Sequence, residues 1–108
     1  MPEIMIKGIP QKNILQVKDQ LYDRLSDILN CPVDWLMIES VHTDYYPPND
    51  SDKRHVPHIC VRWFPRPAET CQLVAEVICE VFRPTGIGCL TVYFEEMQKN
   101  HYFSLGNI

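Results

Sequence analysis

An internal repeat constrains this chain most, because two similar halves of a small protein must pack one against the other. Each half opens on an alternating apolar block that is flanked by two prolines, and the second block begins 55 positions after the first. The matching positions are Pro2, Ile4, Ile6, Lys7, Ile9 and Pro10 in one half, and Pro57, Ile59, Val61, Arg62, Phe64 and Pro65 in the other. Two unrelated strands would seldom share both flanking prolines. The match therefore indicates two copies of one supersecondary unit.

Each half continues into a segment with helical periodicity, in which apolar residues recur every three or four positions. Residues 11–29 form the first predicted helix, which ends near Asn30 ahead of Pro32. Residues 69–83 form the second, which Pro84 ends. The predicted buried stripes are Ile14, Val17, Leu21, Leu25 and Ile28 in the first helix, and Cys71, Val74, Ile78 and Val81 in the second.

Strand-like alternation covers residues 2–9, 35–43, 57–64 and 89–95. The order is strand, helix, strand, twice over. We expect one α+β domain over residues 1–108, built from repeat one (2–46), repeat two (57–97) and a tail (98–108). Two such units predict a four-stranded sheet with both helices on one face. Between the repeats, residues 45–54 carry two prolines and mixed charge, which predicts a loop.

The sheet face away from the helices is expected to carry apolar side chains. A sheet with one solvated face should show polar residues there. The candidates for that face are instead apolar: Met5, Met37, Val41, Cys60 and Phe64. This surplus predicts a second buried layer, most simply a homo-oligomer interface.

Composition excludes several functional classes. The net charge is −4 with scattered basic residues, which argues against a nucleic-acid partner. No apolar run approaches the roughly 18–20 residues of a membrane span, and no signal peptide is evident, so we expect a cytoplasmic protein that does not bind membranes. The five cysteines and four histidines lack metal-ligand spacing, so we expect free thiols and no metal.

Pro2 is the chemically unusual residue. A small second residue normally allows the initiator methionine to be removed, which would leave a prolyl secondary amine at the end of a buried strand. An α-amino group titrates near pH 7.7–8.0, and apolar walls or nearby cations lower that pKa toward the value a general base needs. Many proteins begin Met-Pro without using the proline, so Pro2 alone decides nothing.

Over essentially its whole length the chain resembles the tautomerase superfamily, which includes 4-oxalocrotonate tautomerase and macrophage migration inhibitory factor. The resemblance rests on Pro2, the doubled β-α-β plan, the proline-led opening of each half, the step 30–32 (Asn-Cys-Pro) and the segment 92–97 (Val-Tyr-Phe-Glu-Glu-Met). It implies a homotrimer with sites at subunit boundaries around the N-terminal proline. It also implies that Pro2 acts as the base in keto–enol tautomerisation of a small anionic keto acid, without any cofactor.

The binding residues of that family carry over less well. Lys12 stands where the bacterial enzyme has an arginine opening the first helix, and Arg66 mirrors Lys12 in the second repeat to within a residue. Tyr93 falls on or next to a last-strand asparagine of the cytokine. The resemblance therefore implies that Lys12, Arg66 and Tyr93 bind substrate, each having a purely structural alternative. The second-strand arginine of the bacterial enzyme is replaced by Met37, and the cytokine's lysine falls on Cys31.

Three functional hypotheses follow. The first is an enzyme with Pro2 as general base. The second is a non-enzymatic oligomeric binding or regulatory protein on the same fold, which the missing second-strand arginine favours. The third, a ferredoxin-like fold that binds metal or RNA, shares the repeat but lacks ligand clusters and paired exposed aromatics. His42 and Arg62 are further candidate binding residues with structural alternatives.

Overall fold

The computed structural model describes residues 2–49 and 56–106. The helices and strands are β1 (Glu3–Lys7), α1 (Gln11–Leu29), β2 (Met37–Val41), β3 (His58–Trp63), α2 (Ala68–Phe82) and β4 (Thr91–Glu96). Short 3-10 turns occupy Val33–Trp35, Arg83–Thr85 and Lys99–His101. The predicted strands and helices are confirmed, with ends that differ by at most two residues.

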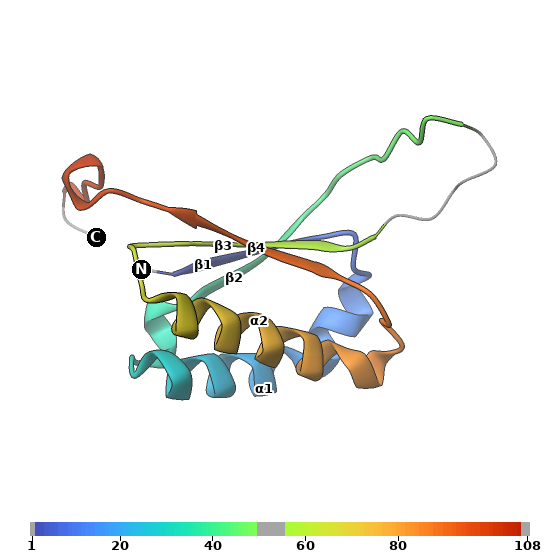
Figure 1. Cartoon of the computed structure of the whole chain (residues 1–108), viewed down its shortest axis with the longest axis horizontal. Coiled ribbons are helices and arrows are strands. Elements are labelled where there is room, and N and C mark those ends of the chain that lie inside the picture. The colour runs from blue at the N-terminus through green and yellow to red at the C-terminus, as the bar shows by residue number, and fades with distance from the viewer. Residues whose placement is uncertain (1, 50–55, 107–108) are drawn as a thin grey trace.

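The four strands form one mixed sheet in the order β2-β1-β3-β4. Within each repeat the two strands are parallel, and the repeats join through antiparallel pairing of β1 with β3. Both helices lie on one face of the sheet (Figure 1). The predicted α+β architecture of two β-α-β units is therefore confirmed.

Helix α1 forms where the apolar period is 3.6 residues, and its stripe faces the sheet. Ile14, Val17, Leu21 and Leu25 are all buried. The helix ends at Asn30, whose φ of 51° lies in the left-handed region that asparagine tolerates better than most residues. Helix α2 buries an equivalent stripe, and the Arg24–Glu80 ion pair of 3.0 Å links the two helices at the surface.

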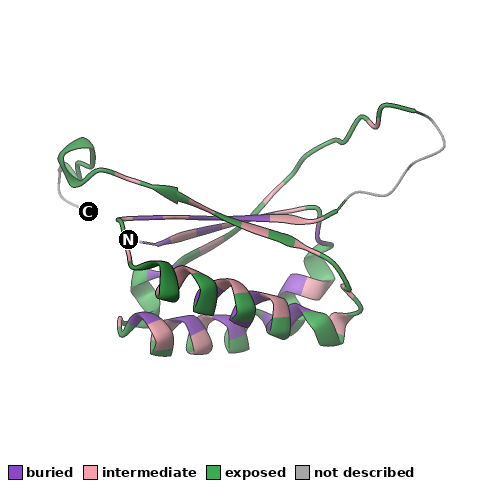
Figure 2. Cartoon of the chain, in the orientation of Figure 1, coloured by how far each residue is buried: buried purple, intermediate pink, exposed green. Residues whose placement is uncertain are grey.

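The hydrophobic core lies between the helices and the two central strands (Figure 2). Buried and half-buried residues alternate along β1, whereas β3 buries three residues in a row. Ile4 and Ile6 of β1 face the helices together with Ile59, Val61 and Trp63 of β3, and all five are at most 1% exposed. Each such side chain contributes roughly 1.5–3 kcal/mol through burial. The strands β1 and β3 therefore form the centre of the core.

The opposite face of the sheet corrects one expectation. Met5, Met37 and Cys60 do lie on it, but the same alternation also places charged residues there. Arg62 pairs with Glu3 at 3.5 Å and with Glu95 at 3.2 Å, which forms a charge ladder across three strands. The outer face is mixed rather than apolar, because strand alternation points these charged side chains to the same side of the sheet as the apolar ones.

Two segments leave the two-layer body. Residues 42–49 continue from β2 as an extended arm (Figure 1). After β4, Tyr102 packs edge-on against Phe64 with ring centroids 5.4 Å apart, while Phe103 and Leu105 stay exposed. The expectations for the tip of the 45–54 loop and for Ile108 concern positions outside the described residues.

Candidate functional site

Pro2 lies buried at the start of β1, where its carbonyl accepts a hydrogen bond of 3.0 Å from the Met37 N–H. Its counterpart in the second repeat, Pro57, accepts an equivalent bond of 2.9 Å from the Thr91 N–H. Both prolines therefore share one structural task, which is to start the parallel pairing of their repeat. That task uses only the backbone carbonyl, and it leaves the amine of Pro2 unexplained. Met1 lies outside the described residues.

Trp63 lies opposite Pro2 in the sheet. The antiparallel register pairs Glu3 with Arg62, so the next pair in line is Pro2 with Trp63. Both residues are buried, and strand alternation places both on the helix side. The Trp63 indole stacks on Phe94 at a centroid distance of 5.0 Å and an interplanar angle of 23°. The ring is thereby fixed beside the start of β1.

Arg66 lies between β3 and α2, two residues before the helix begins, at the same end of the sheet as Pro2. Figure 1 shows the start of α2 beside the start of β1, while α1 begins at the opposite end. The Arg66 guanidinium carbon lies 5.2 Å from the Trp63 ring centroid, within the range of a cation–π contact. The structure thus brings together Pro2 and Arg66, with Trp63 between them. We call these three residues the Pro2 corner.

Two hydrogen-bond donors of the Pro2 corner are unpaired. Trp63 Nε1 and Arg66 Nε are buried, and neither has an acceptor among residues 2–49 and 56–106. An unsatisfied buried donor costs roughly 1–3 kcal/mol, so two of them on a contacting pair of residues call for an explanation.

Lys12 lies at the other end of the sheet. It occupies the first turn of α1, which follows the carboxyl end of β1, and it is exposed. Because the five residues of β1 rise about 3.3 Å each, roughly 15 Å or more of strand separates Lys12 from Pro2. Within one chain, Lys12 and Pro2 do not share a site.

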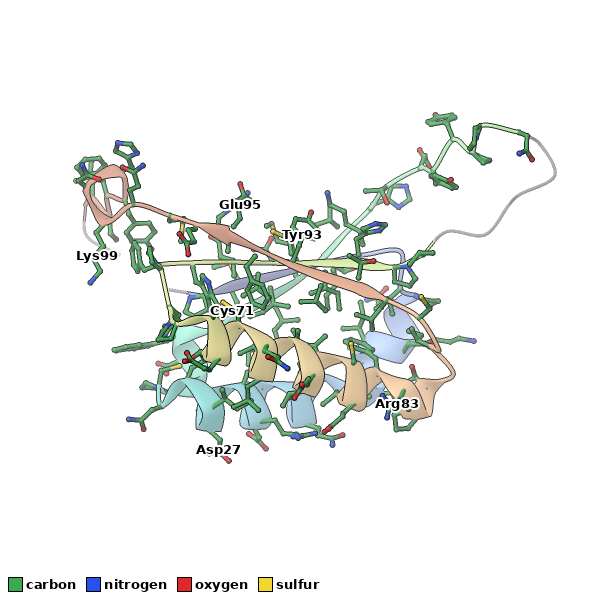
Figure 3. The ribbon with its side chains drawn as sticks, in the orientation of Figure 1. Asp27, Cys71, Arg83, Tyr93, Glu95 and Lys99 are labelled. Atoms are coloured by element: carbon green, nitrogen blue, oxygen red, sulfur yellow. The ribbon has the colours of Figure 1, made fainter. Side chains whose placement is uncertain are left out.

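Tyr93 lies on the outer face of the sheet, away from the helices (Figure 3). Its register partner is Cys60, whose Sγ lies 3.5 Å from Glu95 Oε2. Burial, together with the hydrogen bond to Glu95, raises the pKa of the Cys60 thiol above its ordinary value. Partial burial and the neighbouring Cys60 likewise raise the pKa of Tyr93. Tyr93 therefore belongs to the group of outer-face side chains around Cys60 and lies apart from the Pro2 corner.

The two remaining candidates have local partners. His42 Nε2 lies 3.8 Å from Asp44 Oδ1 on the exposed arm. Arg62 is held in the charge ladder, where its hydrogen bond to Glu95 raises its already high pKa. Neither side chain lies at the Pro2 corner.

The repeat gives the sheet a second, equivalent corner at its other end. The side chains at that corner differ from those of the Pro2 corner. The equivalent of Trp63 is Gly8, and the equivalent of Phe94 is Ser40. A cavity of about 620 Å³ opens there, lined by residues that include Gly8, Gln11, Ser40 and His42. The aromatic stack of the Pro2 corner is therefore specific to one end of a pseudo-symmetric sheet.

The described part of the chain has neither a metal-binding cluster nor a membrane-spanning helix. No group of three or more His, Cys, Asp and Glu side chains there is arranged to hold a metal ion. No helix there has the length and apolar character needed to cross a membrane. All five cysteines have free thiols.

Comparison with known proteins gives a family and a fold. Residues 1–107 match the sequence profile of the family described as "Domain of unknown function (DUF1904)". A crystal structure of a DUF1904 domain from Sebaldella termitidis superposes with a TM-score of 0.86 at 27% identity, covering 96% of this chain and 95% of that one. None of the curated proteins matches the sequence.

More distant structures share the fold. A macrophage migration inhibitory factor-like protein from Entamoeba histolytica superposes with a TM-score of 0.73 at 15% identity, covering 95% of this chain and 94% of that one. A malonate semialdehyde decarboxylase inhibited by 3-bromopropiolate gives a TM-score of 0.70 at 19% identity, covering 99% and 91%. At these identities the likeness shows the fold alone, and it confirms the predicted resemblance in fold to the tautomerase superfamily.

Sequence reasoning did not single out Trp63. In the sequence it is one more apolar residue of an alternating strand. That its indole N–H is buried without a partner among the described residues can be seen only in the folded structure. The one available signal was a tryptophan near the end of a strand, three residues before an arginine. That spacing is common and would not have identified the pair.

Proposed function

This chain belongs to the DUF1904 family, and we propose that it is an enzyme of tautomerase type. The Pro2 amine acts as general base in keto–enol tautomerisation of a small anionic keto acid. Arg66 binds the substrate carboxylate. The reaction needs no metal or organic cofactor, and the five free thiols support a cytoplasmic location.

The observation that carries this proposal is the composition of the Pro2 corner. A buried proline at the N-terminal end of a central strand lies opposite Trp63, and the Arg66 guanidinium covers that indole. Apolar walls and an adjacent cation both disfavour a protonated amine, so they lower its pKa toward neutrality. The same cation attracts a carboxylate, since a guanidinium matches carboxylate geometry.

The proposed step is a proton transfer. The Pro2 nitrogen takes a proton from the carbon next to the keto group, the C–H electron pair forms a carbon–carbon double bond, and the carbonyl oxygen becomes an enolate. Returning the proton to oxygen gives the enol, and the reverse sequence gives the ketone. Proline suits this task because its secondary amine has a rigid lone-pair direction.

We further propose a homotrimer in which Lys12 and Tyr93 reach a Pro2 corner from neighbouring copies. Within one chain Lys12 lies at the far end of β1 and Tyr93 lies on the other face of the sheet. Met37 and Tyr93 are 40% and 41% exposed on that outer face, which leaves apolar area for a second copy to cover. Light scattering should give three times the chain mass of 12.7 kDa, whereas a monomer would leave both residues outside the site.

The deciding experiment is an intact-mass measurement on protein expressed from its own start codon, followed by an assay. A mass short by one methionine means that Pro2 carries a free amine. The enol form of phenylpyruvate should then disappear faster with enzyme than in buffer, as monitored by ultraviolet absorbance. A retained Met1 would make the Pro2 nitrogen an amide and would overturn its role as base.

One observation favours the non-enzymatic alternative. Met37 stands in β2 where the resemblance implies an arginine, so the site has one cation fewer than the bacterial tautomerase. If Pro2 is free and keto acids bind without turnover, the protein is a binding module on the tautomerase fold.

A further inference from the structure

We propose that Trp63 is a substrate-binding donor, whose indole N–H bonds to the keto oxygen while Arg66 Nε bonds to the carboxylate of the same molecule. This inference rests on the proposed function, and it adds the residue that recognises the carbonyl group. It also explains why two neighbouring donors are unpaired in the chain by itself.

The first support is hydrogen bonding. Trp63 is fully buried, and its Nε1 has no acceptor among the described residues. Buried indole N–H groups usually find a partner, so an unpaired one beside a candidate base indicates a missing acceptor. Arg66 Nε lacks an acceptor in the same part of the chain, and its guanidinium lies over the same ring.

The second support is the match between the donors and a keto acid. In a 2-keto acid the keto carbon is bonded directly to the carboxylate carbon. The molecule therefore presents two hydrogen-bond acceptors, the keto oxygen and the carboxylate, close together. The Pro2 corner offers one neutral donor and one cationic donor. The cation suits the carboxylate, whose charge is permanent, and the neutral N–H suits the oxygen whose charge develops during reaction.

The third support is a difference in rigidity. The Trp63 ring is stacked on Phe94, whereas Arg66 has a long side chain outside regular structure. The Arg66 guanidinium lies over the face of the Trp63 ring, so its movement toward an incoming carboxylate would open the space beside the indole. A fixed donor and a movable cover allow a buried N–H to meet a substrate without unfolding the strand.

The chemical consequence concerns the enolate. When Pro2 removes the proton, negative charge moves onto the keto oxygen, and the Trp63 N–H is in place to stabilise it. The loss of one such donor in other enzymes costs about 10²–10³-fold in kcat. We expect Trp63→Phe, which keeps an aromatic ring against Phe94, to lower kcat by about that factor with a smaller change in KM.

The test is an NMR titration with 2-oxobutyrate. The chain has two tryptophans, Trp35 and Trp63, so a ¹⁵N-labelled sample gives two indole N–H resonances, and Trp35→Phe assigns them. Trp35 is 58% exposed and serves as the internal control. Pro2→Ala protein is titrated in parallel, because binding to Trp63 and Arg66 does not require the base.

We expect the Trp63 resonance to move downfield and saturate with 2-oxobutyrate, in both wild-type and Pro2→Ala protein. Butanoate, which lacks the keto oxygen, should move it much less. Arg66→Met should weaken 2-oxobutyrate binding at least tenfold, while Arg83→Met, an exposed arginine at the other end of α2, should not.

A Trp63 resonance that stays in place while other resonances saturate would overturn the inference, and so would equal shifts with butanoate. These outcomes are separate from failure of the proposed function. If Trp63 responds as expected but the wild type has no turnover, the donor pair stands and Pro2 is not a base. Because the titration reads the wild-type indole directly, it does not depend on Trp63→Phe folding.

Discussion

Met5 and Cys60 occupy equivalent positions in the two repeats, and they are paired with each other across β1 and β3. The pseudo-twofold axis of the chain therefore passes between these two residues. The same axis relates the pair Glu3–Arg62 to the pair Lys7–His58, and the pair Met5–Glu39 to Cys60–Tyr93. One rotation thus generates the whole sheet, and departures from it mark the positions where the two halves have diverged.

The axis supplies a matched control for Pro2. Pro2→Ala should abolish tautomerisation. Alanine has a primary amine, which is more mobile and a weaker base than the ring-held secondary amine of proline. Pro57→Ala removes the equivalent ring while keeping the equivalent carbonyl hydrogen bond, so it should retain activity. Thermal unfolding should show similar small losses for both variants. Activity that survives Pro2→Ala would show that another group is the base.

Stability should fall at high pH because of Cys60. Burial and Glu95 raise the pKa of its thiol above the ordinary 9.0, so the folded state holds this proton more tightly than the unfolded state. The resulting stabilisation is fully present below pH 9.0 and is lost as the pH rises through the higher folded-state pKa. Urea unfolding under reducing conditions, compared at pH 7 and pH 10.5, should show the loss, and Cys60→Ala should show a smaller decline.

Thiol reactivity offers a related prediction. The thiolate is the reactive form, so a buried thiol with a raised pKa reacts slowly. At pH 8, iodoacetamide should modify exposed Cys89 well before Cys60. Peptide mass spectrometry after timed quenching measures the order. Modification of Cys60 as fast as Cys89 would mean that the outer face opens readily or that Cys60 is not buried in solution.

Helix α1 should show a strong difference between its two faces. Leu21 is fully buried, so Leu21→Ala should lower the free energy of unfolding by about 2–5 kcal/mol. Leu15 lies on the same helix and is 61% exposed, so Leu15→Ala should change it by less than about 0.5 kcal/mol. Urea denaturation of both variants measures the contrast. Equal losses would place Leu15 in an interface or would contradict the packing of α1.

The end of helix α1 should tolerate only certain residues. Asn30 has a φ of 51°, and it donates its backbone N–H to the Asp27 carbonyl. Asn30→Gly should leave stability unchanged or slightly higher, because glycine enters this region without a Cβ clash. Asn30→Val should cost about 1–2 kcal/mol, since a β-branched residue is strained there. Differential scanning calorimetry of the two variants measures the difference. Equal melting temperatures would show that Asn30 does not adopt this cap geometry in solution.

Local periodicity and the repeat determined most of the fold. The stripe containing Val17 and Leu21 specified α1, the alternation of Ile4 and Ile6 specified β1, and the doubled proline block specified two β-α-β units. These features are readable because helix and strand periods depend on neighbours only a few residues apart. The identification of Pro2 as the unusual group was also made from the sequence, since it depends only on chain chemistry.

Only the tertiary structure decided which residues accompany Pro2. From the sequence, Lys12 and Arg66 are equivalent candidates, because both are cations at mirrored positions of the two repeats. Antiparallel pairing of β1 with β3 brings the end of β3, and hence Arg66, to Pro2, and it sends Lys12 to the far corner. The ion pair between Glu3 and Arg62 arises from the same register. Glu3 and Arg62 are 59 positions apart in the sequence, and no local period encodes their contact.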